Sequence, residues 1–294
     1  MRILIAICSA CALADRRAAC RDTWVQDIKD LAPNVSYKFF VGVPSREEDK
    51  EIKLEEDVVQ LQCNDDYRHL PEKIHRMLEW IDANCEYDYA FKCDDDTYVV
   101  PSRLENLLEN RDDYVGDPMG GIAAYGGAGY FLSKYAVGKI LSDDTIWRDH
   151  GLEDLHVGEL CNHHGIKIVK GEGLYGGTYP VPAVNNTVVT NHKVIPHAFY
   201  WRWQAFSAGV AATGRIIISS RKDETSFFNN GIFCIRGVTE GSWRYNKDTR
   251  TLHLAYNTRE RYFNDAFVRK DDCTFELGDK TLVFEENPDA WLVK

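Results

Sequence analysis

The sequence predicts an α/β domain with a mainly parallel sheet, followed by a small antiparallel β domain. Up to about residue 205, short apolar segments typical of strands alternate with amphipathic segments typical of helices, as in parallel α/β sheets. Beyond that point, short strand-like segments follow one another with turn residues between them. The 294 residues suffice for one large and one small domain. We therefore predict domains at residues 1–205 and 206–294.

The expected elements of the first domain follow from their apolar patterns. The clearest helix spans 70–85, where Pro71 suits the first turn and Leu70, Ile74, Leu78 and Ile81 share one face. The helix expected at 14–28 would take Asp15 as its cap and expose its basic residues. Strands are expected at 2–9, 36–44, 57–63, 87–93 and 166–169, and further helices at 101–110, 134–142 and 152–165.

The second domain is predicted from short strands and hairpin signals. Asn230-Gly231 and Gly278-Asp279 are turn pairs typical of hairpins. Strands are expected at 215–220, 227–237, 241–245, 251–256, 273–279 and 280–286.

Charge and cysteine content narrow the classes of function and the compartment. The formal net charge of −11 argues against a nucleic-acid partner, because phosphate backbones attract positive proteins. The apolar start of the chain is shorter than the ~20 residues that cross a bilayer, and a buried first strand is favoured over a signal peptide. No transmembrane segment is expected. Nine scattered cysteines suit a reducing compartment, and Cys8 and Cys11 are expected to be buried apolar residues.

Three consecutive aspartates, Asp94, Asp95 and Asp96, directly follow an apolar strand. Ligands of α/β sheets bind beyond the carboxyl ends of the strands, which is where this triplet is expected. Ionised aspartates are hard oxygen ligands suited to Mg²⁺, Ca²⁺ or Mn²⁺. On an extended segment Asp94 and Asp96 would point to one side and Asp95 to the other. The alternative is a solvated acidic turn.

Six segments, in sequence order, carry a resemblance to a known family. They are RRAACRDTW (16–24), NDDYRHLPEKIHRMLEW (64–80), KCDDDTYV (92–99), GGAGYFLS (126–133), LEDLHVG (152–158) and NHKVIPHAF (191–199). Together they resemble the motifs of the inverting β-1,3-glycosyltransferases of glycosyltransferase family 31, the galactosyltransferase and Fringe-like group. The resemblance covers roughly residues 1–200. Leu155, the run 69–71 and Phe199 depart from the family pattern, so the donor and the acceptor stay open.

The resemblance implies a GT-A fold, a uridine diphosphate sugar as donor, and Mn²⁺ or Mg²⁺ as cofactor. By the family pattern, Asp96 would bind the metal that contacts the diphosphate. Asp94 would lie near the ribose side and share the metal, and His192 would supply a nitrogen ligand. His197 is the competing candidate for that ligand.

The same resemblance implies a catalytic base at the start of the helix expected at 152–165. Inverting transfer needs a group that takes the proton of the attacking hydroxyl. Asp154 is the predicted base and Glu153 the second candidate. The alternative is an acidic pair that merely opens a helix at the positive end of its dipole.

Several further residues are expected to contact the donor. For the arginines the alternative is a solvated helix face, and for the glycines a tight turn. Tyr125 and Tyr130 are expected to form a wall facing the sugar. The predicted donor contacts are Ser9, Arg16, Arg21, Asp66, Lys73, Asp94, Asp95, Gly127 and Gly129.

The predicted function is transfer of a hexose, galactose or N-acetylhexosamine, from the uridine diphosphate sugar to a glycan hydroxyl, with inversion and a β-1,3 linkage. The acceptor would be a saccharide or a lipid-linked glycan of a surface polysaccharide. A bacterial-type cytoplasmic enzyme, or one bound peripherally at the inner membrane face, is expected. The alternatives are a glycan-binding protein on a transferase scaffold, a retaining transferase of the same fold, and a metal-dependent phosphotransferase or hydrolase.

Overall fold

A computed structural model gives the fold in two compact units, one comprising Met1–Gly177 with Thr187–Tyr200 and the other Thr178–Asn186 with Trp201–Lys294. The boundary expected between residues 205 and 206 stays a prediction. The structure describes residues 1–44, 54–143, 147, 151–175, 188–194, 212–218, 223–228, 232–235, 239–246, 250–257, 262–270, 274–277 and 280–284.

The first unit is built on a seven-stranded sheet in the order β10-β6-β9-β4-β1-β2-β3. Neighbouring strands are parallel except around β9, which runs antiparallel to both β4 and β6. The predicted α/β fold with a mainly parallel sheet is therefore confirmed. The strands are β1 (Ile3–Cys8), β2 (Val35–Val43), β3 (Val58–Asn64), β4 (Tyr89–Asp94), β6 (Tyr114–Gly116), β9 (Tyr130–Ser133) and β10 (Val169–Lys170).

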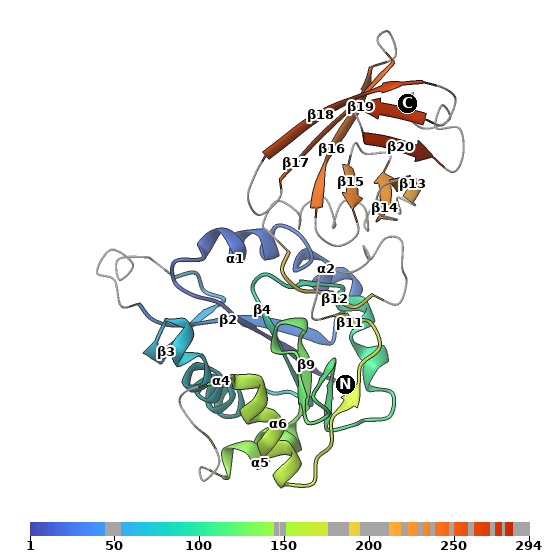
Figure 1. The fold of residues 1–294 in the computed structure, drawn as a ribbon. Coiled ribbons are helices and arrows are strands. Elements are labelled where there is room, and N and C mark those ends of the chain that lie inside the picture. The colour runs from blue at the N-terminus through green and yellow to red at the C-terminus, as the bar shows by residue number, and fades with distance from the viewer. Residues whose placement is uncertain are drawn as a thin grey trace. The chain divides into compact units, whose positions relative to one another are not determined.

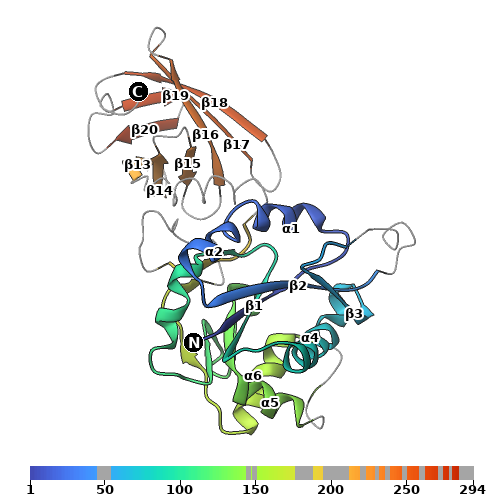
Figure 2. The same ribbon diagram turned by 180° about the vertical axis from the view of Figure 1, so that it is seen from behind.

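Helices cover both faces of this sheet, which explains why every residue of β1 is buried. Figures 1 and 2 show α1 (Ala14–Arg21) and α2 (Gln26–Leu31) on one face. On the other face lie α4 (Leu70–Asn84), α5 (Lys134–Leu141) and α6 (Glu153–His163). The apolar face predicted for α4 is confirmed, since Ile74, Leu78 and Ile81 are buried in the core.

The segment 14–28 differs from the expected single helix. It forms α1 and α2, separated at 22–25, and Leu13 rather than Asp15 is the cap residue of α1. The Thr23 hydroxyl donates to the Ala19 carbonyl at 2.6 Å, a side-chain bond that competes with helical pairing. The expectation that the basic residues are all exposed is wrong for Arg17, which is fully buried.

A second difference lies at 101–110, where a helix was expected. The chain instead forms two short 3₁₀ turns, η2 (Pro101–Arg103) and η3 (Glu105–Leu108). The amide of Leu104 donates to the Pro101 carbonyl, three residues back.

Short strands bring distant segments to the end of β4. The strand β5 (Tyr98–Val99) pairs antiparallel with β12 (Thr190–Asn191), which pairs in parallel with β11 (Leu174–Tyr175). A 3₁₀ turn, η4 (Gly126–Ala128), precedes β9 and follows the hairpin of β7 (Pro118–Met119) and β8 (Ala123–Ala124). The segments near residues 94, 126 and 192 therefore lie together at the carboxyl end of β4.

The described residues of the second unit form eight antiparallel strands, which confirms the predicted antiparallel β domain. Each strand pairs with the next, and β13 also pairs with β20, so the sheet closes on itself. The strand expected at 227–237 is divided between β14 and β15, and β18 was not predicted. The strands are β13 (Ala212–Ile218), β14 (Asp223–Phe228), β15 (Ile232–Ile235), β16 (Thr239–Asn246), β17 (Thr251–Asn257), β18 (Tyr262–Arg269), β19 (Thr274–Leu277) and β20 (Lys280–Phe284). Among all residues that the structure describes, no helix is both long and apolar enough to cross a membrane.

Candidate active site

The aspartate triplet lies in a turn at the carboxyl end of β4. Asp94 is the last residue of the strand, and the amide of Thr97 donates to its carbonyl at 3.1 Å, which closes the turn. The amide of Val194 donates to the Asp96 carbonyl at 2.8 Å. This bond and the β5–β12 pairing hold His192, just after β12, beside the triplet.

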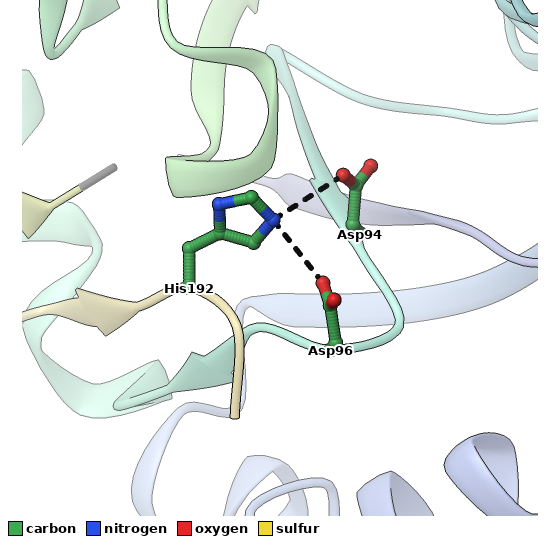
Figure 3. A group of neighbouring side chains, drawn as sticks. All are labelled: Asp94, Asp96 and His192. Atoms are coloured by element: carbon green, nitrogen blue, oxygen red, sulfur yellow. Dashed lines mark ion pairs between the residues drawn. The ribbon is translucent and has the colours of Figure 1, made fainter. Parts of the chain in front are cut away.

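Asp94, Asp96 and His192 form a compact group of ligand atoms (Figure 3). The His192 Nε2 atom lies 3.2 Å from Asp96 Oδ1 and 3.7 Å from Asp94 Oδ2. All three ligand atoms are within 4.8 Å of one another. Two carboxylate oxygens and one imidazole nitrogen are a donor set that Mn²⁺ accepts. The three residues predicted as metal ligands are thus brought together. His197, the competing candidate, lies outside the described residues.

The carboxylate of Asp96 is held in its ionised form. Burial opposes ionisation, but the hydrogen bond from His192 and the charge of Arg16 lower the pKa of Asp96 below its usual value. Arg16 Nη1 lies 3.4 Å from Asp96 Oδ2.

Asp95 is held by two residues that follow β1, and its predicted opposite orientation stays a prediction. Its Oδ2 accepts from the Ser9 hydroxyl at 2.8 Å, and its Oδ1 accepts from Arg16 at 3.0 Å. Burial raises the pKa of Asp95 to about 6, although Ser9 and Arg16 act against this. A turn rather than an extended strand separates the side chains. The structure thereby joins Ser9, Arg16 and Asp95, three of the predicted donor contacts.

Lys73, another predicted donor contact, supports the loop that follows β1. Its ammonium donates to the Ser9 carbonyl at 2.9 Å and to Asp65 at 2.5 Å, and both side chains are buried. Asp65 also accepts from the amides of Cys11 and Gly42. Burial would raise the pKa of Asp65, but Lys73 and these amides lower it below its usual value. Sequence reasoning missed Asp65, although it lies in the segment 64–80 that carries part of the family resemblance.

Two of the predicted donor contacts bind other parts of the protein in the structure. Asp66 caps the 3₁₀ turn η1 (Tyr67–His69), where its carboxylate accepts from the amides of Arg68 and His69. Arg21 contacts Asp57 at 2.7 Å and Glu55 at 2.9 Å. The described contacts of Asp66 and Arg21 therefore do not include the aspartate triplet 94–96. Contact of these two residues with a donor stays a prediction.

The glycine turn η4 lies against His192. A Cβ atom on Gly127 would come within 2.0 Å of the His192 ring, so only glycine fits beside the ring in this position. Gly129 has a φ of +91°, and a Cβ there would meet the Phe91 ring at 2.3 Å. Tyr125 is 45% exposed, whereas the Tyr130 side chain is fully buried. Tyr130 is therefore part of the core rather than a wall of the site.

The two acidic residues that open α6 have different environments. Glu153 is 4% exposed, and its carboxylate accepts from Lys92 at 2.6 Å and from the Tyr130 hydroxyl at 3.1 Å. Asp154 is only partly buried, and it accepts from the amides of Gly126 at 3.3 Å and Leu155 at 2.9 Å. The structure therefore separates an anchored glutamate from a more accessible aspartate.

Lys92 is a site residue that sequence reasoning missed. It is 2% exposed and lies within 2.9 Å of Asp94 and 2.6 Å of Glu153. Burial would lower the pKa of Lys92, but these two carboxylates raise it well above its usual value, so the lysine is charged. A lysine inside an otherwise apolar strand was the available signal, since a buried charge needs partners.

A cavity of about 310 Å³ lies beside Asp94 and His192, and its size is typical of small-molecule sites. Two of the candidate metal ligands, a partly accessible carboxylate and exposed apolar side chains meet around it. The lining residues are Tyr67, Leu70, Asp94, Tyr125, Gly126, Gly127, Gly151, Leu152, Glu153, Asp154, His192 and Lys193. Such a site suits reactions in which a metal-bound phosphate group leaves and a carboxylate accepts a proton.

Comparison with known proteins supports the predicted family. Residues 15–126 match the family model described as Galactosyltransferase, a range that includes the aspartate triplet. A probable beta-1,3-galactosyltransferase 12 of Arabidopsis thaliana is 35% identical over 107 residues, 33% of this chain and 29% of that protein. Beta-1,3-galactosyltransferase 4 of Mus musculus is 30% identical over 113 residues, 36% of this chain and 30% of that protein. The chain thus spans about a third of the length of these relatives.

Solved structures show only a weak likeness. The catalytic domain of Drosophila beta1,4galactosyltransferase 7 has a TM-score of 0.38 at 12% identity, covering 67% of this chain and 73% of that chain. A similarity this low supports no argument about the site.

Proposed function

We propose that this chain is a metal-dependent glycosyltransferase of the β-1,3-galactosyltransferase kind, with a GT-A fold. It would move a hexose, galactose or N-acetylhexosamine, from a uridine diphosphate sugar to a hydroxyl of a saccharide acceptor. One observation carries the proposal: Asp94 and His192, which group with Asp96, line the same cavity as Asp154. The family match over residues 15–126 supports it further.

The metal site would stabilise the leaving diphosphate. Asp94, Asp96 and His192 would hold Mn²⁺ or Mg²⁺, and a bound divalent cation supplies positive charge where negative charge develops in the transition state. Arg16, which contacts Asp95 and Asp96, lies at the same edge and adds a fixed positive charge. The loop 9–11, held by Lys73 and Asp65, would receive the nucleotide at the carboxyl ends of the strands.

Asp154 is the better candidate for the base that takes the acceptor proton. Its carboxylate lines the cavity and is partly accessible. Glu153 lines the cavity too, but one of its oxygens binds the Lys92 ammonium and the other accepts from Tyr130. A carboxylate that already neutralises a buried ammonium is a poor proton acceptor. Proton transfer to Asp154 would accompany attack of the hydroxyl on the anomeric carbon, with inversion.

Exposed apolar side chains at the cavity suit a saccharide. Tyr67 is 77% exposed, and Tyr125 and Leu152 are also exposed. Sugar rings present apolar faces that pack on such side chains, above all on aromatic rings. These residues would hold the acceptor or the donor sugar next to Asp154.

The wider setting of the reaction is also part of the proposal. The seven cysteines of residues 1–175 are all free, which fits a reducing compartment such as the cytoplasm. A saccharide or lipid-linked glycan met at the inner membrane face would be the acceptor, and the linkage would be β-1,3. Analysis of the product by NMR reports both the anomeric configuration and the linkage, and an α product would contradict inversion.

The test is release of uridine diphosphate from a panel of its sugars with Mn²⁺, with and without chelator. We expect hydrolysis of one sugar that chelator abolishes. Once an acceptor is found, Asp154→Asn should lower transfer by ~10²–10⁴-fold, the range for loss of a general base. Glu159→Gln, an exposed change on the same helix, is the matched control. If no sugar is bound or hydrolysed, the proposal fails and the glycan-binding alternative takes its place.

A further inference from the structure

The ammonium group of Lys92 contacts three oxygen atoms. It lies 2.9 Å from Asp94 Oδ1, 2.6 Å from Glu153 Oε1 and 3.2 Å from the Gly126 carbonyl oxygen. The contacts with Glu153 and Gly126 are hydrogen bonds that Lys92 donates, and the contact with Asp94 is an ion pair. These acceptors belong to three segments of chain: the end of β4, the start of α6 and the turn η4. One buried charge therefore ties three parts of the site together.

The first consequence concerns Asp94. Its Oδ1 is taken by Lys92, while its Oδ2 faces His192 Nε2 at 3.7 Å. Lys92 thereby determines which oxygen of Asp94 points to the group of metal ligands. A cation between Asp94, Asp96 and His192 would meet a single, preoriented oxygen of Asp94.

The second consequence concerns Asp154. Glu153, its neighbour at the start of α6, is held by Lys92. The Gly126 carbonyl accepts from Lys92, and the Gly126 amide donates to Asp154 Oδ2 at 3.3 Å. Both the helix start that carries Asp154 and the turn that orients its carboxylate therefore depend on the same ammonium.

We propose that Lys92 is a positioning residue that aligns the metal ligand Asp94 with the base Asp154, and that its charge weakens cation binding by the unliganded protein. This inference rests on the proposed function for the roles of Asp94 and Asp154. Lys92 touches neither the reacting atoms nor the cation.

The two parts of this inference predict opposite changes when Lys92 is replaced: cation binding improves and the reaction slows. A positive charge 2.9 Å from a ligand carboxylate repels an incoming divalent cation, and burial leaves this repulsion poorly screened. Loss of the charge should tighten cation binding while loss of alignment slows the reaction. A lysine that only stabilised the fold would give weaker binding and slower reaction together.

The experiment measures Mn²⁺ binding without nucleotide, by electron paramagnetic resonance of the free ion, in the wild type and in Lys92→Met. We expect binding at least ~10-fold tighter in Lys92→Met. Lys73→Met is the matched control, because it also removes a buried lysine paired with a carboxylate, but one whose partners are Ser9 and Asp65. Weaker or unchanged binding in Lys92→Met overturns the inference. Binding by Lys92→Met where the wild type binds no Mn²⁺ counts as tightening.

The kinetic arm uses hydrolysis of the uridine diphosphate sugar by the same proteins at saturating Mn²⁺. We expect kcat of Lys92→Met to fall ~10²-fold with little change in KM for the sugar, the size typical of a small misplacement of reacting groups. A kcat within threefold of wild type overturns the positioning role. Absence of turnover in the wild type contradicts the proposed function instead, while the Mn²⁺ comparison still decides the electrostatic part.

A second pair of variants covers the case in which Lys92→Met does not fold. Lys92→Met/Glu153→Gln leaves no unpaired buried glutamate, and it is compared with Glu153→Gln alone. Tighter Mn²⁺ binding in the double variant than in Glu153→Gln supports the inference. Equal or weaker binding contradicts it.

Discussion

The two buried lysines of the first unit, Lys73 and Lys92, share their chemistry but differ in what their partners do. Each ammonium contacts a buried carboxylate, Asp65 at 2.5 Å and Glu153 at 2.6 Å. Asp65 is further held by two backbone amides, so that pair forms a closed structural clamp on the loop after β1. Lys92 also contacts Asp94, whose other oxygen faces His192.

The difference shows that the role of a buried ion pair depends on what the second oxygen of its carboxylate contacts. Around Lys73 both carboxylate oxygens of Asp65 are used within the protein. Around Lys92 one oxygen of Asp94 stays directed at the cavity edge. The same type of pair holds a loop in one place and, in the proposal above, orients a metal ligand in the other.

The largest expected effect is on stability, and it sharpens the contrast between the lysines. Removing one partner of a buried pair typically costs ~3–5 kcal/mol. We expect Lys92→Met to reach that range, because Glu153 would keep only the Tyr130 hydroxyl. Lys73→Met should cost less, about 2–3 kcal/mol, since Asp65 keeps two amide donors. Urea unfolding, monitored by hydrogen exchange of α4 and α6, measures the loss of stability in both variants. Equal losses in Lys92→Met and Lys73→Met would contradict the contrast between the two lysines.

The clamp around Lys73 also predicts a pH dependence. The pKa of folded Asp65 lies below its ordinary value of 3.8, so its ionised form contributes stability above pH ~4 that is lost as the pH falls through the folded pKa. Asp65→Asn should lower stability at pH 7 by about 2–3 kcal/mol, because Lys73 loses its charged partner. The difference from wild type should shrink below pH ~4. A difference that stays constant from pH 7 to pH 3 would argue against an ionised Asp65 in the clamp.

On the cavity side, Gly127→Ala should disturb the metal ligands without touching either lysine. The new Cβ would clash with the His192 ring at 2.0 Å, so the ring must leave its present position 3.2 Å from Asp96. We expect Mn²⁺ binding to weaken ~10-fold, as for the loss of a group that orients a ligand.

The control for this change is Gly138→Ala in α5, where a Cβ would meet nothing within 4 Å. It should leave Mn²⁺ binding unchanged and stabilise the helix by about 0.5–1 kcal/mol. Equal Mn²⁺ affinities in the two alanine variants would remove His192 from the proposed ligand set.

The smallest expected effect separates the neighbours Asp65 and Asp66. Asp66 caps η1 from an exposed position, so Asp66→Ala should cost only about 0.5–1 kcal/mol. Donor affinity, measured by calorimetry with uridine diphosphate and Mn²⁺, should stay near wild type. A large loss of affinity would show that Asp66, as the family resemblance implied, contacts the donor.

Local patterns in the sequence predicted the architecture and the aspartates of the candidate metal site. Alternating strand and helix patterns predicted the parallel sheet, because burial of apolar faces is set by residue spacing. A triplet of aspartates after an apolar strand pointed to the cavity edge, because parallel strands end together. The resemblance supplied His192 and Asp154, and the structure places both at the cavity that Asp94 also lines.

Only the tertiary structure decided how the charged residues pair. Lys92 and Glu153 are 61 positions apart, and nothing in either local sequence marks them as partners. The burial of Arg17 and the use of Asp65 rather than Asp66 also depend on backbone groups that the fold brings close. Spacing along the chain reports which face of an element is apolar. The environment of a buried charge is set by segments distant in sequence, so it becomes visible only when the chain is folded.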